Sequence, residues 1–154
     1  MSMIQRNTSH YHKAYRVALK RKILAFEGQV FLRRDLTKNR SNQVQLRLNR
    51  ALNAFTDEGF IVKISHGLYA KAERMTLSNG ENSPVLQASF EEMAIEALDK
   101  LALKWEWGRA IQEYNSGKTT QIPIAFTIRL KSRFRGTISA EGRTVLFEDG
   151  VNAR

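Results

Sequence analysis

One amphipathic segment, residues 42–58, constrains the fold of this chain more than any other. Its apolar residues recur at helical spacing and form a single stripe, which is the pattern of a helix packed on a core. They are Val44, Leu48, Ala51, Leu52 and Phe55. Ser41 is a favourable N-cap residue before this segment, and Gly59 ends it. The sequence therefore predicts one long helix here, packed on a core by its apolar stripe.

The segments around this helix predict the rest of an N-terminal unit. Helical spacing of apolar residues predicts an earlier helix over 15–27, and Asn7, Thr8 and Ser9 are candidate N-caps for an earlier start. Residues 29–36 predict a short apolar strand followed by one or two helical turns. Residues 60–64 have the β-branched character of a strand, and 68–70 return as a second strand after a turn. This order of elements is that of a winged helix-turn-helix, which we assign to residues 1–72.

The second half of the chain predicts a smaller unit of mixed structure. Residues 73–85 lose periodicity and are rich in polar turn-forming residues, so we expect a linker there. Residues 86–154 then predict an α+β unit with antiparallel strands. Its helix begins after Ser89, an apolar alternation over 124–130 predicts a half-buried strand, and 140–142 predicts a hairpin turn. The fold class of the whole chain is predicted as α+β.

The formal net charge of +10 is confined to one third of the chain. Residues 1–50 contain twelve Lys or Arg and only two acids, Glu27 and Asp35, whereas the remaining residues contain thirteen of each sign. Clustered cations suit a polyanionic partner, because they release counterions condensed on phosphates. A solvated basic surface is the alternative, and an anionic membrane is a third. We favour double-stranded DNA as the partner.

The exposed face of the predicted helix over 42–58 has the chemistry of base recognition. Asn and Gln pair with adenine in the major groove, Arg pairs with guanine, and this face holds almost no acid. Leu46 on the same face is suited to a thymine methyl, to packing, or to a protein partner. His66 at the hairpin tip is suited equally to a phosphate or to solvent. The predicted DNA-binding residues are Arg33, Arg34, Lys38, Arg40, Ser41, Asn42, Gln43, Arg47, Asn49, Arg50, Asn53, Lys63, Ser65 and His66.

A second basic group surrounds the predicted C-terminal strands. It either extends the DNA footprint, docks a partner protein, or protects an exposed sheet edge by its charge. Its members are Lys131, Arg133, Arg135 and Arg143.

Several classes of function find no support in the sequence. The chain has no cysteine, and His10 and His12 have no neighbouring carboxylate, so we expect neither a metal nor a cofactor. Residues 117–119 resemble the end of a P-loop, but Gln112 stands where that motif needs glycine. No catalytic arrangement can be singled out, so we do not expect an enzyme. The start lacks a signal peptide and no apolar run could span a membrane, so we expect a soluble, cytoplasmic protein.

An ordered set of short segments resembles one family of small bacterial proteins common on mobile elements. These are the proteins related to the AbiEi-like antitoxins of type IV toxin–antitoxin systems. The resemblance covers about residues 15–148. It implies an N-terminal winged helix-turn-helix that represses its own promoter, and a C-terminal domain that counteracts a nucleotidyltransferase-like toxin. The matching segments are 30–36, 50–52, 58–61, 66–72, 114–123 and 133–135.

Two functions follow as expectations. The first is a sequence-specific transcriptional regulator that binds double-stranded DNA, with the character of an antitoxin-like autorepressor. The second is a protein-interaction module, an antitoxin or inhibitor, whose C-terminal domain binds and neutralises a cognate toxin. The sequence leaves the oligomeric state open, although a homodimer would match a two-fold operator.

Overall fold

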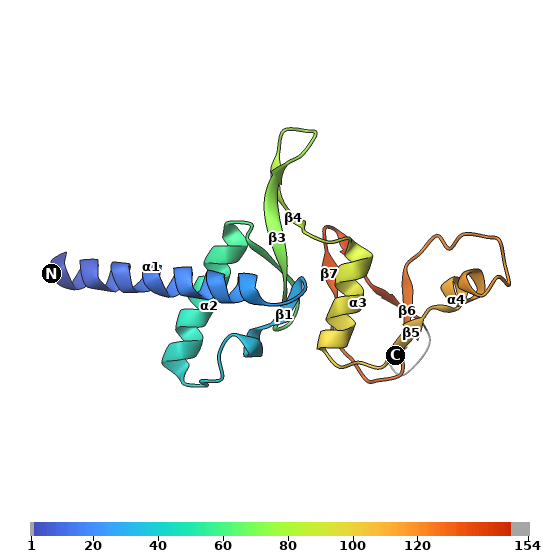
Figure 1. Ribbon diagram of the computed structural model, residues 1–154, viewed down its shortest axis with the longest axis horizontal. Coiled ribbons are helices and arrows are strands. Elements are labelled where there is room, and N and C mark those ends of the chain that lie inside the picture. Colours follow the sequence, from blue (N-terminus) through green and yellow to red (C-terminus); the bar gives the residue numbers. More distant parts are fainter. Residues whose placement is uncertain (1, 149–154) are drawn as a thin grey trace.

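The fold is organised around a sheet that has helices on both of its faces (Figure 1). The computed structural model describes residues 2–148, with side chains from Tyr11 onward. The described chain is of mixed α+β class, with four α-helices and predominantly antiparallel sheets. The predicted fold class is confirmed at that level.

The N-terminal sheet contains four antiparallel strands. These are β1 (Val30–Leu32), β2 (Ile61–Ser65), β3 (Leu68–Thr76) and β4 (Asn82–Leu86). The order is β1-β3-β2, and β4 pairs with the distal part of β3. Because successive residues of a strand point to opposite faces, Phe31 and Tyr69 share one face, whereas Val30 and Ala70 share the other.

Helices α1 (Ser2–Ala25) and α2 (Asn42–Asp57) cover the first face of this sheet. Their contact side chains form a core with Phe31 and Tyr69. Four residues of the predicted apolar stripe of α2 are buried and the fifth, Val44, is half-buried. Ser41 accepts a hydrogen bond from Val44 N at 3.4 Å as the N-cap of this helix. α1 begins thirteen residues before the predicted start at Tyr15. The helical turns predicted after β1 are a single 3-10 turn, η1 (Arg33–Asp35).

Helix α3 (Phe90–Lys100) covers the second face of the sheet. Ser89 accepts a hydrogen bond from Glu92 N at 3.2 Å, so the predicted helix start is confirmed. Val30 and Ala70 lie in the same apolar core as Met93 and Leu98 of α3. This core also contains Ile128 and other residues near the C-terminal end, so packing is continuous from the first sheet to the last strands.

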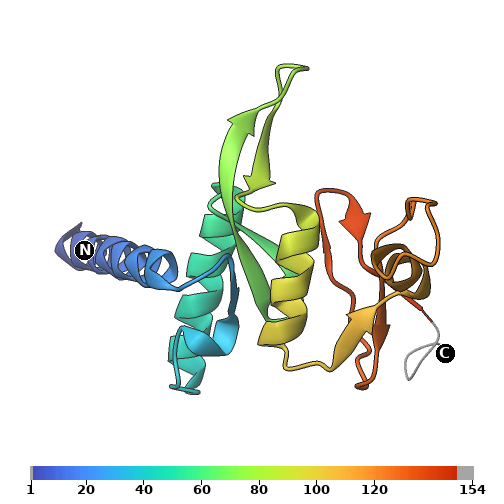
Figure 2. The same cartoon turned by 45° about the vertical axis from the view of Figure 1, so that its right-hand side comes forward.

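The C-terminal part of the chain adds small sheets behind α3 (Figure 2). Strand β6 (Thr127–Leu130) pairs antiparallel with β5 (Trp105–Trp107) and parallel with β9 (Leu146–Phe147). The expectation of antiparallel strands throughout this unit is therefore corrected at β9. The hairpin β7 (Ser139–Ala140) and β8 (Arg143–Thr144) confirms the turn predicted at 140–142.

Residues 73–85 form a projecting β-hairpin, not the predicted aperiodic linker (Figure 2). The Asn79-Gly80 sequence makes its turn, in which Gly80 has φ of 86° and Leu77 N donates to Glu81 O at 2.7 Å. The polar residues that suggested a linker are exposed along the hairpin, so burial imposed no apolar alternation on them.

Two further elements differ from the prediction. Only the second half of the strand expected over 124–130 is paired, and Ile124 is 98% exposed. The seven-residue helix α4 (Arg109–Asn115) was not predicted. Its first amide, Arg109 N, donates to the carboxylate of Glu148 at 3.0 and 2.9 Å. This cap comes from a residue distant in sequence, which local patterns do not show.

The turn between α1 and β1 is fixed by two charged side chains from other elements. Glu96 of α3 accepts from Gln29 N at 2.9 and 2.8 Å and from Val30 N at 2.5 Å. Gly28 has φ of 80°, and a Cβ atom there would overlap the Glu96 carboxylate. On the other side, the ammonium of Lys71, which is only 7% exposed, donates to Phe26 O at 2.7 Å.

We predict that Glu96→Ala lowers the free energy of unfolding by about 3 kcal/mol, because it leaves two backbone amides without their acceptor. Urea unfolding of the full chain measures this change. Glu92→Ala removes an exposed carboxylate from the first turn of the same helix and is expected to lower the value by less than about 1 kcal/mol. Equal effects of the two substitutions would contradict a holding role for Glu96.

Candidate nucleic-acid interface

The outward face of α2 follows from its buried stripe. Leu48, Leu52 and Phe55 face the sheet, so the residues half a turn away are exposed. Among the predicted DNA-binding residues, Arg47 is half-buried, and the remaining ones on α2 all lie on the exposed side. The exposed ones are Asn42, Gln43, Asn49, Arg50 and Asn53.

The loop before α2 presents two further cations. Lys38 and Arg40 are exposed and form no hydrogen bond or ion pair with any described residue. Asn39 organises this loop, because its side-chain oxygen accepts from Ser41 N at 2.9 Å and its carbonyl accepts from Gln45 Nε2 at 2.8 Å. Sequence reasoning missed Asn39 and Gln45, although Asn before a helix is a recognised turn signal.

Arg33 is engaged within the protein. Its guanidinium donates to Gln45 Oε1 at 2.6 Å, to Gln45 O at 3.2 Å, and to Asn49 Oδ1. These hydrogen bonds connect η1 to α2, so Arg33 positions the turn, and its contact with DNA stays a prediction. Arg34 beside it is exposed.

The tip of the β2–β3 hairpin lies next to this arginine. Arg33 N donates to Gly67 O at 2.9 Å, which connects the tip, η1 and α2 in one continuous set of contacts. His66 and Lys63 are exposed, and Ser65 is half-buried. The structure thus brings the hairpin tip next to η1.

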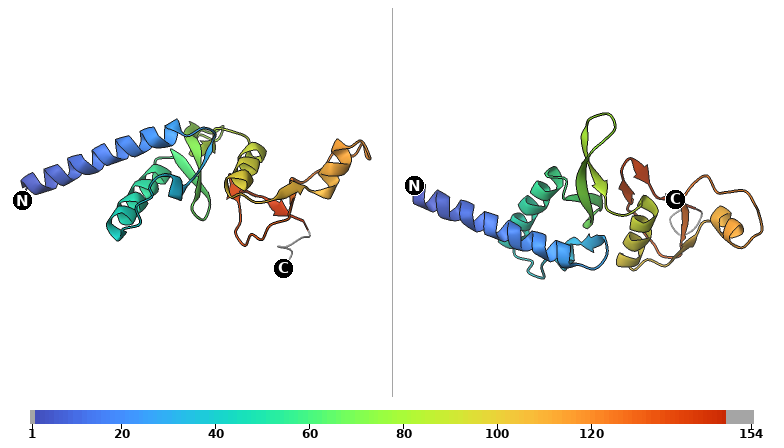
Figure 3. Two further views of the ribbon diagram at one scale, coloured as in Figure 1. Left: turned by 60° about the horizontal axis from the view of Figure 1, so that its bottom comes forward. Right: turned by 45° about the horizontal axis from the view of Figure 1, so that its top comes forward.

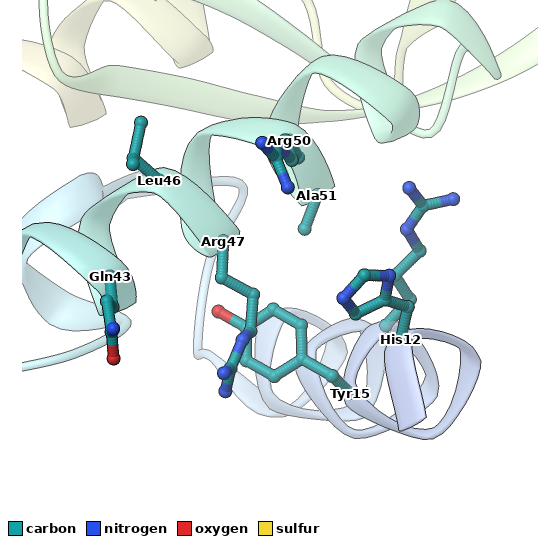
Figure 4. A pocket seen from close by; sticks show the side chains of 8 residues that line it. His12, Tyr15, Gln43, Leu46, Arg47, Arg50 and Ala51 are labelled. Carbon is teal, nitrogen blue, oxygen red and sulfur yellow. The ribbon is translucent and has the colours of Figure 1, made fainter. Parts of the chain in front are cut away.

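A cleft of about 380 Å³ separates α1 from α2 (Figure 4). Arg47 of α2 bridges the two helices. Its guanidinium lies 4.8 Å from the ring centroid of Tyr11 and 5.4 Å from that of Tyr15, and it donates to Tyr11 Oη at 2.8 Å. Burial raises the pKa of the Tyr15 phenol, although the positive charge of Arg47 opposes this shift. His12, Arg16, Gln43, Leu46 and Arg50 complete the lining.

Few of the N-terminal cations are neutralised within the protein. Among the described side chains of residues 11–50, Lys20 alone forms an ion pair, with Glu58 at 2.7 Å. Lys22 donates to Leu36 O at 2.9 Å, and Arg33 and Arg47 bind as above. Seven cations have no hydrogen-bond or ion-pair partner in the described part of the chain. They are Lys13, Arg16, Arg21, Arg34, Lys38, Arg40 and Arg50.

The second basic group does not form one free surface. Arg143 donates to Glu91 at 2.6 Å and lies 4.4 Å from the Phe90 ring centroid. This hydrogen bond lowers the pKa of the Glu91 carboxyl. Lys131 lies 3.3 Å from Glu106. Arg133 and Arg135 are exposed and form no ion pair within residues 11–148. Arg143 thus connects the β7–β8 hairpin to α3.

Comparisons with known proteins add no relative. The chain matches no family model, no curated protein sequence and no solved structure. No helix in the described range is both long and apolar enough to cross a membrane. The described side chains contain no group of three or more potential metal ligands.

We predict that Arg33→Ala lowers the free energy of unfolding by about 1–2 kcal/mol, because Gln45 and Asn49 lose a charged hydrogen-bond donor. Arg34→Ala removes the neighbouring, unpartnered charge and is expected to change stability by less than about 0.5 kcal/mol. Thermal or urea unfolding compares the two variants. A larger loss for Arg34→Ala would contradict the positioning role assigned to Arg33.

Proposed function

We propose that the chain is a sequence-specific, double-stranded DNA-binding transcriptional regulator. Residues 1–72 supply a winged helix-turn-helix, in which α2 is the recognition helix and the β2–β3 hairpin is the wing. A single turn, η1, stands where the middle helix usually lies, and Arg33 connects this turn to α2 by hydrogen bonds. These hydrogen bonds fix the position of η1 relative to the recognition helix.

One observation carries the proposal: four of the seven unneutralised cations border the exposed face of α2. Lys38 and Arg40 precede its first turn, Arg50 lies on its outward face, and Arg16 lies across the cleft. Side chains that are not satisfied within the protein are free to neutralise phosphates, and this gives affinity for any duplex.

The polar residues on the same face supply the specificity. Asn42, Gln43 and Asn53 are exposed and have no side-chain hydrogen bond within the described chain, so their amides are free to pair with base edges. B-DNA has a major groove about 12 Å wide that admits an α-helix, whereas the deep, narrow major groove of RNA does not. This geometry favours duplex DNA over duplex RNA.

Autorepression in the manner of an antitoxin is part of the proposal. It rests on the resemblance of the ordered segments to AbiEi-like antitoxins, and it includes binding to an operator and a homodimer that matches its two-fold symmetry. The proposal also includes a cytoplasmic location, because the regulator has to meet its operator DNA there.

An exposed apolar surface favours a second candidate, a protein-interaction module. Ile122 is 70% exposed and Ile124 is 98% exposed, beside a cleft of about 230 Å³ between α4 and this segment. Apolar side chains gathered in this way are typical of protein contacts. Under this candidate, the C-terminal half binds a partner such as a cognate toxin, and DNA contact is incidental.

We predict that Arg50→Ala weakens binding to a duplex, selected from a random-sequence pool by the full chain, by about three- to tenfold, because it removes a cation that neutralises phosphate. Lys104→Ala, an exposed cation of the C-terminal half, is the matched control and is expected to change affinity by less than twofold. Fluorescence anisotropy at several salt concentrations measures both. Small, equal effects would contradict the assignment of the interface to α2 and favour the second candidate.

A further inference from the structure

Helix α1 is longer than its role in the core requires. Its 24 residues span about 36 Å at 1.5 Å per residue. Among the side chains described from Tyr11 onward, those of α1 that reach the core are Tyr15, Leu19 and Ile23, all in its second half. Figures 1 and 3 show the first half running past α2 with no other element beside it. The helix therefore forms an arm that leaves the body of the protein.

Helix α1 carries charge of one sign only. Residues 2–25 contain six Lys or Arg and no Asp or Glu, and two of the six, Arg6 and Lys13, lie in the first half. A solvated helix normally mixes both signs, which supports it through pairs three or four residues apart. Here like charges repel along the helix, and its positive N-terminal dipole end has no acid in the first turn. A polyanion along the arm would relieve both effects.

The direction of the arm is fixed relative to α2. The Arg47 guanidinium packs against the rings of Tyr11 and Tyr15, and this contact joins the two helices (Figure 4 shows Arg47 beside Tyr15). Beyond it, Arg16 of α1 and Arg50 of α2 both line the cleft. Cations from both helices thus border one opening, whose volume of about 380 Å³ is large enough for a phosphodiester segment.

We infer that α1 is a second DNA-contacting element, an arm that lies along the phosphate backbone of the duplex whose groove α2 enters. The cleft receives a phosphodiester segment between Arg16 and Arg50. This inference rests on the proposed function, since it assigns the same duplex to both helices. Arg47 is a positioning residue that holds the angle between them.

The first test compares two arginines on opposite sides of helix α1. Arg16 lines the cleft, whereas Arg21 is exposed on the side of α1 away from the core. Arg16→Ala is expected to weaken binding of the selected duplex by about three- to tenfold and to reduce the slope of log affinity against log salt by about 1. Arg21→Ala is expected to leave both values unchanged. Equal effects of the two variants would overturn the inference, because they indicate diffuse charge attraction.

The second test places the arm on the duplex directly. The chain has no cysteine, so Lys13→Cys and Lys118→Cys each create a single attachment point for an iron-chelate reagent that cleaves DNA nearby. The arm inference predicts cleavage from position 13 at a few nucleotides of one flank, and none from position 118 in the C-terminal half. No cleavage from position 13 would overturn it.

The outcomes separate this inference from the function on which it rests. If Arg50→Ala weakens binding while Arg16→Ala does not, the arm inference fails and the proposed function stands. If neither substitution matters, the proposed function fails as well. If an RNA duplex binds as tightly as the DNA and depends equally on Arg16, the assignment to DNA is overturned.

Discussion

The turn at residues 26–30, held between two opposite charges, is the constraint on which the arrangement of this protein depends. Lys71 binds the carbonyl of Phe26 at the end of α1, and Glu96 binds the amides of Gln29 and Val30 at the start of β1. Both charges satisfy backbone groups that a helix end and a tight turn leave without partners. Because Gly28 has the positive φ required there and leaves room for the carboxylate, the chain reverses at one defined place.

This turn determines how the two halves of the protein relate to each other. Glu96 belongs to α3, whose other side contacts the C-terminal strands, and Lys71 belongs to the central strand of the first sheet. The turn therefore fixes the direction of α1 relative to the sheet and the position of α3 on the opposite face. Arg47, stacked on Tyr11 and Tyr15, then fixes the direction of α1 relative to α2. The basic surfaces that we assign to DNA follow from these two constraints.

Elements whose signal is local could be predicted from the sequence. The α2 stripe, its Ser41 cap, the Ser89 cap of α3 and the turn at 140–142 each depend on residues close in sequence, and the structure contains them all. Elements held by distant partners could not be predicted in this way. The cap of α4 by Glu148 and the parallel pairing of β9 depend on residues that only the fold brings together.

The candidate interface shows the same division. Charge located it in the first third of the chain, and helical spacing placed Asn42, Gln43 and Arg50 on an exposed face, where the structure has them. Sequence could not separate a free cation from an engaged one. Arg33 and Arg143 have the same chemistry as the neighbouring arginines, yet Arg33 is hydrogen-bonded to α2 and Arg143 is paired with Glu91. Only the structure shows that these two arginines hold other elements in place.

The most direct test of the central claim is amide chemical-shift mapping by NMR of the full chain, titrated with its selected DNA duplex. We predict the largest shifts in residues 37–53 and in the exposed part of α1, with smaller shifts at the β2–β3 tip and none in residues 105–148. Shifts confined to residues 105–148, or spread evenly over all exposed basic residues, would contradict the central claim.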